Sequence, residues 1–104
     1  AGGDVAFVGA VGGDAFGLQL RERLAGDGIE LSALRTVGTP TGTAHIAVLD
    51  GGENSIVVVP GANGAVDALD AAGVAVIDAA RFVVAQFERP LPLIRSAFER
   101  ARSR

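Results

Sequence analysis

The chain has 104 residues, of which 49% are apolar and 20% charged, and its formal net charge at pH 7 is −3. This length allows one small domain, and the apolar fraction excludes a disordered chain. The sequence contains no Cys, no Lys and a single His. It therefore excludes disulfides, thiolate zinc sites, the phosphate-binding lysine of a Walker loop and multi-histidine metal sites.

Charge and aromatic content argue against two classes of partner. Nine Arg stand against twelve acidic residues, and the only aromatic residues are five Phe, which is not the composition of a surface for nucleic acid or anionic membranes. The chain start has no basic or apolar signal segment, and apolar runs such as residues 56–60 are far shorter than the ~20 residues that span a bilayer. We expect a cytoplasmic protein with no nucleic-acid and no membrane partner.

The first part of the chain predicts a strand, a tight turn and a helix. The apolar run at residues 5–9 is typical of a strand buried on both faces, and the glycine-rich residues 10–13 predict the turn. Asp14 is a suitable N-cap for a helix that stops at Gly26. The apolar stripe of this helix recurs every four residues, at Phe16, Leu20 and Leu24.

The middle of the chain predicts a second strand and a hairpin. Residues 34–38 suit a strand that lies parallel to the first after a right-handed crossover. Two β-rich runs, residues 43–49 and 55–59, flank the turn sequence Asp-Gly-Gly-Glu-Asn and predict a β-hairpin. A hairpin inserted in a βα alternation is expected to be an appendage of the main sheet.

The last part of the chain predicts two helices and a third core strand. After a break at residues 60–64, a helix is expected up to Ala80, with Asp67 and Asp70 in a capping arrangement. Residues 82–87 predict the strand. The final helix has Pro92 in its first turn and an apolar stripe at Ile94, Ala97, Phe98 and Ala101. This order is typical of a layered α/β architecture.

Glu88 is the residue that most suggests a binding site. It follows the predicted strand 82–87, at the carboxyl end where open α/β sheets bind their ligands. A carboxylate there can accept hydrogen bonds from ligand hydroxyls, and a solvated loop acid is the alternative.

The other candidates are weaker. The glycines at 9, 12, 13 and 17 do not have the spacing of a dinucleotide-binding turn, and Asp14 would repel a pyrophosphate. His45 is more simply a half-buried structural residue than a catalyst. The residues by themselves assemble no catalytic pair, no cofactor cradle and no metal cluster.

Three segments together resemble the PfkB family of carbohydrate kinases, and within it the ribokinases. They are residues 8–17 (VGAVGGDAFG), residues 40–63 (PTGTAHIAVLDGGENSIVVVPGAN) and residues 86–90 (QFERP). They follow one another in the order and spacing of that family. The resemblance implies a partial three-layer, ribokinase-like (Rossmann-like) α/β sandwich with a β-hairpin inserted from the lid.

The resemblance also implies a domain division and an activity. Residues 1–104 would form a single partial domain, with core segments 1–40 and 61–104 and a lid hairpin at 41–60. The implied activity of the full-length protein is transfer of the ATP γ-phosphoryl group to a sugar hydroxyl, ribose to ribose 5-phosphate, with Mg²⁺ and a monovalent cation. Another PfkB-type sugar kinase, such as a fructokinase, is the alternative within the family.

The resemblance assigns three residues to the sugar. Glu88 matches a ligand of a sugar hydroxyl, and Ala44 and Val58 match apolar lid positions that pack on the sugar. The family's sugar-clamping glycine segment, its Asn-x-x-Glu motif and its Gly-Ala-Gly-Asp motif are not in this sequence. The 104-residue chain is therefore expected to be an internal fragment that is inactive, binds no ATP, and forms a homo-oligomer through the lid hairpin or open strand edges.

Two interpretations from other classes remain open. One is a stand-alone α/β interaction module that uses the hairpin edge for β-augmentation. The other is a small nucleotide-binding α/β domain, which ATP binding by the 104-residue chain would favour. A longer reading frame with a downstream Gly-Ala-Gly-Asp motif would favour the kinase.

Overall fold

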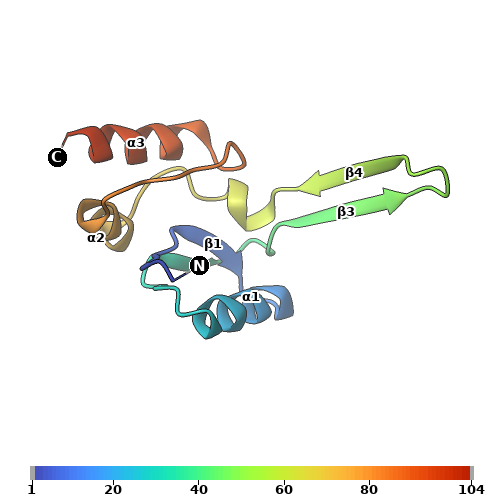
Figure 1. The fold of residues 1–104 in the computed structure, drawn as a ribbon, viewed down its shortest axis with the longest axis horizontal. Coiled ribbons are helices and arrows are strands. Elements are labelled where there is room, and N and C mark those ends of the chain that lie inside the picture. Colours follow the sequence, from blue (N-terminus) through green and yellow to red (C-terminus); the bar gives the residue numbers. More distant parts are fainter. Residues whose placement is uncertain (1, 104) are drawn as a thin grey trace.

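A computed structural model describes residues 2–103 as a small layered body with one long projection (Figure 1). Helix α1 lies on one side of strands β1 and β2, and helices α2 and α3 lie on the other side, so the predicted α/β class is confirmed. The elements in chain order are β1 (Gly9–Gly12), α1 (Ala15–Gly26), β2 (Leu34–Val37), β3 (Thr43–Val48), β4 (Asn54–Val59), the 3₁₀ turn η1 (Gly61–Gly64), α2 (Ala71–Ala79) and α3 (Leu91–Arg102).

Strands β1 and β2 form the parallel pair that the crossover rule predicts. The pairing begins at Gly9, which lies opposite Leu34. Upstream of it the chain makes only a bridge between Ala6 and Glu30. The predicted strand is therefore displaced toward the C-terminus, and the prediction of a turn at residues 10–13 is wrong. All four residues of β1 are buried, because small side chains let this strand approach its neighbours closely.

Helix α1 begins as predicted but buries a different face. The Asp14 carboxylate accepts a hydrogen bond from the Gly17 N–H at 2.9 Å, so Asp14 is the N-cap. Two members of the predicted apolar stripe, Phe16 and Leu20, are 58% and 45% exposed. The buried residue of this helix is Gly17, because the helix packs closest to β1 at its first turn.

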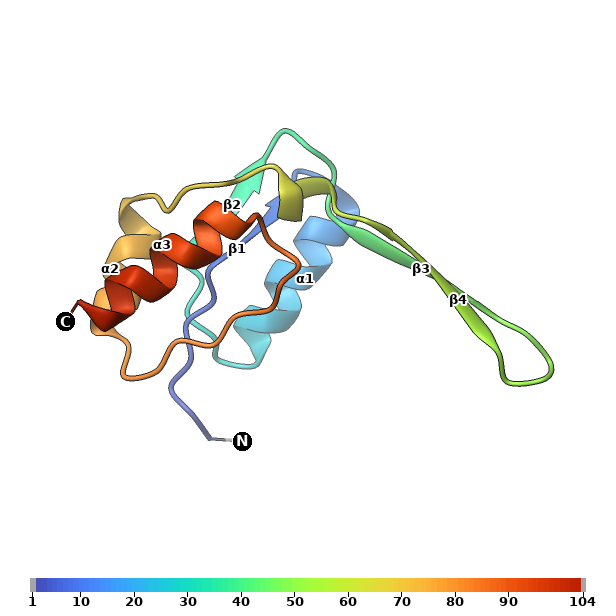
Figure 2. The same cartoon turned by 90° about the horizontal axis from the view of Figure 1, so that it is seen from above.

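The predicted hairpin is confirmed. Strands β3 and β4 pair antiparallel, with Thr43 opposite Val59 and Val48 opposite Asn54. Gly52 has a φ of 86°, a conformation that favours glycine in the connecting turn. The hairpin extends away from the body (Figure 2), and with it the molecule reaches 50 Å along its longest axis. Its side chains are almost all exposed, so it is an appendage of the main sheet.

Helices α2 and α3 pack on each other across the body. Asp70 caps α2 by accepting a hydrogen bond from the Gly73 N–H at 2.8 Å. Of the two aspartates in the predicted capping arrangement, Asp70 is therefore the N-cap. Pro92 lies in the first turn of α3, as predicted. The Arg100 guanidinium donates two hydrogen bonds to the Asp78 carboxylate, at 2.7 and 2.6 Å, and joins the two helices. These hydrogen bonds raise the pKa of Arg100.

The prediction of a third core strand at residues 82–87 is wrong. The segment is extended, but within residues 2–103 it forms no ladder with another strand. Phe82, Val84 and Phe87 are 82%, 93% and 83% exposed. A strand needs a neighbour to accept and donate its backbone hydrogen bonds. Here an open cavity lies between this segment and β1.

Candidate sugar site at the hairpin root

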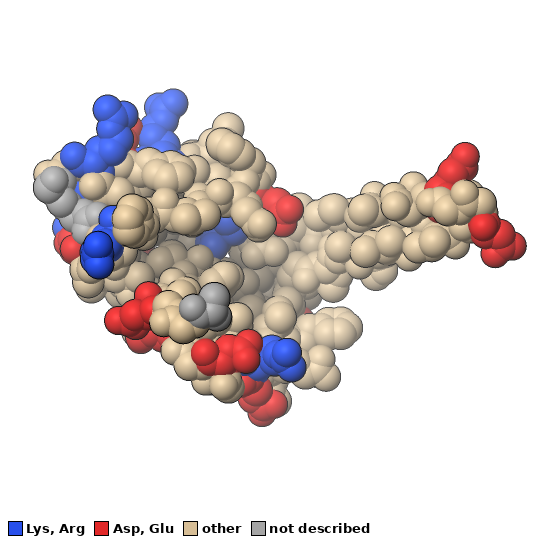
Figure 3. Space-filling view, viewed as in Figure 1, with Lys and Arg blue, Asp and Glu red and all other residues tan. Residues whose placement is uncertain are grey.

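A cavity of about 700 Å³ lies between β1, the extended segment 82–89 and the three helices. Figure 3 shows the body hollowed between its upper and lower parts. One end of the cavity lies where the hairpin joins the body. The polar residues that line the cavity come from three separate segments, and they are Thr41, Asn63, Gln86, Glu88 and Arg89.

Glu88 lies on the loop between the extended segment and α3, with an exposed side chain. Its neighbour Arg89 crosses toward the body, where its Nε donates a hydrogen bond to the Asn63 carbonyl at 3.0 Å. Burial lowers the pKa of Arg89, and the positive charge of Arg35 lowers it further. Arg89 thereby fixes the Glu88 loop against the hairpin root, and Glu88 remains available to a ligand.

The root of the hairpin is held by a network around Thr41, the one buried polar residue among residues 2–103. The Thr41 hydroxyl donates to the Asp14 carboxylate at 2.6 Å, and the Thr41 N–H donates to the same carboxylate at 2.9 Å. The Thr41 hydroxyl in turn accepts from the Gly12 N–H at 2.9 Å. The hydrogen bonds from Thr41, and then that from Gly17, lower the pKa of Asp14. Asp14 therefore has two roles: it caps α1, and it anchors the root of the hairpin through Thr41.

Close backbone contact also joins the two ends of the hairpin. The Ala62 N–H donates to the Pro40 carbonyl at 2.7 Å. A Cβ on Gly42 would lie 2.5 Å from both the Pro60 carbonyl oxygen and the Asn63 Nδ2 atom. Only glycine fits at that position, so the hairpin leaves the body in a defined direction.

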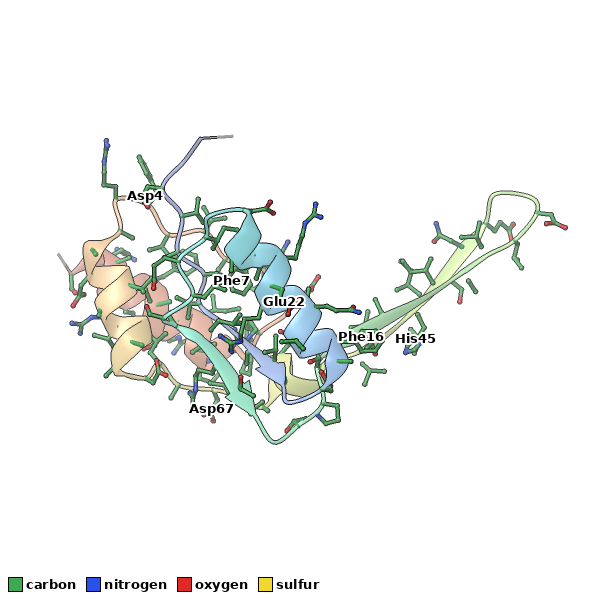
Figure 4. All side chains as sticks on the ribbon, turned by 90° about the horizontal axis from the view of Figure 1, so that it is seen from below. Asp4, Phe7, Phe16, Glu22, His45 and Asp67 are labelled. Atoms are coloured by element: carbon green, nitrogen blue, oxygen red, sulfur yellow. The ribbon has the colours of Figure 1, made fainter. Side chains whose placement is uncertain are left out.

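The structure brings together two of the three predicted sugar residues. Ala44 and Val58 are directly opposite each other in the β3–β4 register, and both are exposed. Neither lines the cavity that Glu88 lines. His45 lies near the hairpin root, where its Nε2 atom is 3.2 Å from the Thr43 hydroxyl (Figure 4). It is exposed, so the expectation of a half-buried His45 is wrong.

Sequence reasoning missed Thr41 and Arg89. Thr41 stands in a Pro-Thr-Gly stretch that reads as an ordinary turn, and its partner Asp14 is 27 residues away. Arg89 was missed for the same reason, because the Asn63 carbonyl that accepts its hydrogen bond is 26 residues away. No local sequence pattern predicts contacts between residues that are this far apart in the chain.

In the described part of the chain, no three His, Cys, Asp or Glu side chains gather as metal ligands. Of the helices within residues 2–103, none has the length and apolarity to cross a membrane.

Comparison with known proteins places this geometry in a family context. Residues 1–101 match the profile of the pfkB family carbohydrate kinases. The chain is 35% identical to ribokinase from Schizosaccharomyces pombe over 97 residues, which is 91% of this chain and 30% of the relative. The chain thus spans less than a third of the length of this curated relative.

Solved structures agree with the sequence relationship. Arabidopsis thaliana ribokinase, complexed with ribose and ATP, superimposes with a TM-score of 0.88 at 30% identity, over 96% of this chain and 34% of that chain. Ribokinase from Giardia lamblia gives a TM-score of 0.75 at 35% identity, over 94% and 31% of the two chains. The layered body and the projecting hairpin are therefore similar to one third of these enzymes.

Proposed function

The chain belongs to the pfkB family of carbohydrate kinases. We propose that it is part of an ATP-dependent sugar kinase that phosphorylates a pentose hydroxyl, with ribose as the sugar. The observation that supports this most is the position of Glu88. Glu88 lines the same cavity as Gly42 and Asn63, which lie in the two segments that form the hairpin root. The names of the relatives, which are ribokinases, support ribose over other sugars.

In the proposed mechanism, this chain supplies binding and water exclusion. Glu88 accepts a hydrogen bond from a sugar hydroxyl and orients it. The hairpin acts as a lid, with Ala44 and Val58 packing on the apolar face of the sugar. A lid that excludes water suppresses transfer of the phosphoryl group to water. We assign residues 1–40 and 61–104 to the core and residues 41–60 to the lid.

The described residues do not fit the phosphates of ATP or the metal ions of the proposed reaction. The N-terminus of α1, which could otherwise receive an anion, is occupied by the Asp14 carboxylate. No metal-ligating cluster lies within residues 2–103. We therefore assign no residue of this chain to ATP, Mg²⁺ or a monovalent cation, and no catalytic residue.

A chimaera tests the proposed function. Residues 1–104 replace the matched segment of S. pombe ribokinase, and ADP formation is followed with ribose and with fructose as the sugar. We expect ribose-dependent ADP formation by the chimaera and none by the 104-residue chain alone. A folded chimaera that phosphorylates fructose but not ribose would contradict the ribose assignment and favour a fructokinase. A folded chimaera that phosphorylates neither sugar would contradict the kinase assignment.

We also propose that the chain forms a homodimer through its hairpin. One face of the hairpin carries exposed apolar side chains on both strands, and both strands have an open edge. Beside the two positions that we assign to the sugar, these side chains are Ile46, Val48 and Ile56.

The test of the dimer is sedimentation equilibrium at micromolar concentration. We expect the wild-type chain to be a dimer and Ile56→Asp to be a monomer, because the charge would be buried in the interface. Ser55→Asp, on the opposite face of the same strand, is the matched control and should remain dimeric. A monomeric wild-type chain would refute the dimer.

A further inference from the structure

The two strands of the hairpin leave the body from segments that are held in different ways. Residues 60–63, which follow β4, are held to the loop before α3, because Arg89 donates a hydrogen bond to the Asn63 carbonyl at 3.0 Å. Residues 40–42, which precede β3, are held through Thr41 to the start of α1. Figure 2 shows the hairpin leaving the body beside that end of α1. The direction of the hairpin therefore depends on both attachments.

The two carboxylate oxygens of Asp14 divide the work of capping and attachment. Oδ1 accepts from the Gly17 N–H at 2.9 Å and from the Thr41 hydroxyl at 2.6 Å. Oδ2 accepts from the Thr41 N–H at 2.9 Å. The bond to Gly17 caps α1, and the two bonds to Thr41 hold the hairpin. An amide at this position could keep the cap through Oδ1, but its NH₂ group would then face the Thr41 N–H, donor against donor.

Burial makes the attachment to Asp14 hard to replace. Thr41 is 6% exposed, so its N–H would remain unsatisfied if the carboxylate were lost. Hydrogen bonds to an ionised carboxylate are also stronger than those between neutral groups, and the lowered pKa of Asp14 keeps its carboxylate ionised. The lost bonds can be replaced only if Thr41 moves toward solvent, and that movement would turn the hairpin about its other attachment.

A small rotation at the root of the hairpin becomes a large displacement at the positions assigned to the sugar. Ala44 and Val58 lie opposite each other in the hairpin, and Ala44 is about 10 Å of extended chain beyond Thr41. A rotation of about 20° at Thr41 would therefore move Ala44 by about 3–4 Å. A gap of about 1 Å already removes up to half of a van der Waals contact. Contact of both side chains with a sugar on Glu88 thus requires a fixed root.

We propose that Asp14 is a positioning residue for the lid: acting through Thr41, it fixes the direction of the hairpin and so holds Ala44 and Val58 against the sugar. The role toward the sugar rests on the proposed function, whereas the fixed direction does not. The apparent affinity of a site falls with the fraction of molecules in the binding-competent arrangement. Loss of the Asp14 attachment therefore raises the KM for ribose. It leaves kcat unchanged, because bound ribose selects the molecules whose lid is in place.

Pulsed electron paramagnetic resonance measures the direction of the hairpin in the 104-residue chain. The sequence has no Cys, so spin labels can be attached through Ser55→Cys on β4 and Ser96→Cys on α3, two exposed positions. An excess of unlabelled chain suppresses distances between two copies. We expect a narrow distance distribution for the otherwise unsubstituted chain and one at least about twofold wider for Asp14→Asn. An unchanged distribution would refute the proposal.

Further variants separate the attachment from the helix cap. Asn caps helices as well as Asp does, so circular dichroism should show that Asp14→Asn retains its helices. Thr41→Val loses the hydroxyl and should also widen the distribution, whereas Thr41→Ser keeps the hydroxyl and should leave it narrow. Asp70→Asn makes the matched change at the N-cap of α2 and should leave it narrow too. A wide distribution for Thr41→Ser or Asp70→Asn would mean a general loosening of the body and would overturn the proposal.

Kinetics of the chimaera with S. pombe ribokinase test the role toward the sugar. We expect Asp14→Asn to raise the KM for ribose by about tenfold and to change kcat by less than about twofold, with the KM for ATP unchanged. Asp70→Asn should change none of the three constants. General destabilisation would reduce the amount of active enzyme, so a fall in kcat with an unchanged KM would refute the role toward the sugar.

The two measurements also distinguish positioning from direct contact. Glu88→Gln removes charge from the sugar contact itself, so it should raise the KM for ribose without widening the distance distribution. A chimaera that phosphorylates no sugar would refute the proposed function, and with it the role toward the sugar. The distance measurement needs no sugar, so it still decides whether Asp14 directs the hairpin.

Discussion

Replacing Glu88 by Gln in the chimaera is expected to raise the KM for ribose by about 10- to 150-fold and to leave the KM for ATP unchanged. A hydrogen bond to a charged group typically contributes about 1.5–3 kcal/mol, and the amide keeps the shape of the side chain while losing the charge. The Glu88 loop is fixed by Arg89 through the Asn63 carbonyl, so the substitution removes the charge from the ligand contact without moving the loop. Initial rates over a range of ribose and ATP concentrations provide the measurement.

The matched control for this substitution is Glu99→Gln. Glu99 is also exposed, but it lies in α3, and it is not among the residues that line the cavity. Both kinetic constants of this control should equal those of the unsubstituted chimaera. A Glu88→Gln chimaera whose KM for ATP rises while that for ribose stays constant would show that Glu88 is wrongly assigned to the sugar.

Replacing Gly17 by Ala is expected to destabilise the chain by about 3 kcal/mol, at the upper end of the usual cost of overpacking. The added Cβ would lie against the Gly12 carbonyl oxygen, closer than any real contact allows. It would also lie 3.1 Å from the Thr41 hydroxyl and 3.3 Å from the Asp14 carboxylate. Because a backbone atom blocks it, α1 must move away from β1, and the network that anchors the hairpin opens.

Urea unfolding followed by circular dichroism measures this effect, with Gly26→Ala as its control. Gly26 ends the same helix, and a Cβ there would meet nothing within 4 Å. The control should therefore be neutral or stabilising by up to about 1 kcal/mol, which is the helix propensity of Ala over Gly. Equal unfolding midpoints for the two variants would mean that α1 and β1 do not approach as closely as the structure shows.

Local patterns in the sequence determined much of the fold. The hairpin followed from two β-rich runs and one turn sequence, and the starts of α1 and α3 followed from Asp14 and Pro92. The family followed from three motifs in order, and residues 1–101 match it. These features could be predicted because each depends on residues a few positions apart, whose conformations are coupled through the chain itself.

Tertiary structure alone decided the strand boundaries and the candidate site. Residues 82–87 have the composition of a buried strand, but a strand exists only where another strand accepts its hydrogen bonds, and here a cavity lies in that place. Thr41 is buried because Asp14 and Gly12, 27 and 29 residues away, pack around it. Composition determines which segments prefer extended or helical backbone, whereas contacts between distant segments determine which of them pair, and that depends on how the whole chain packs.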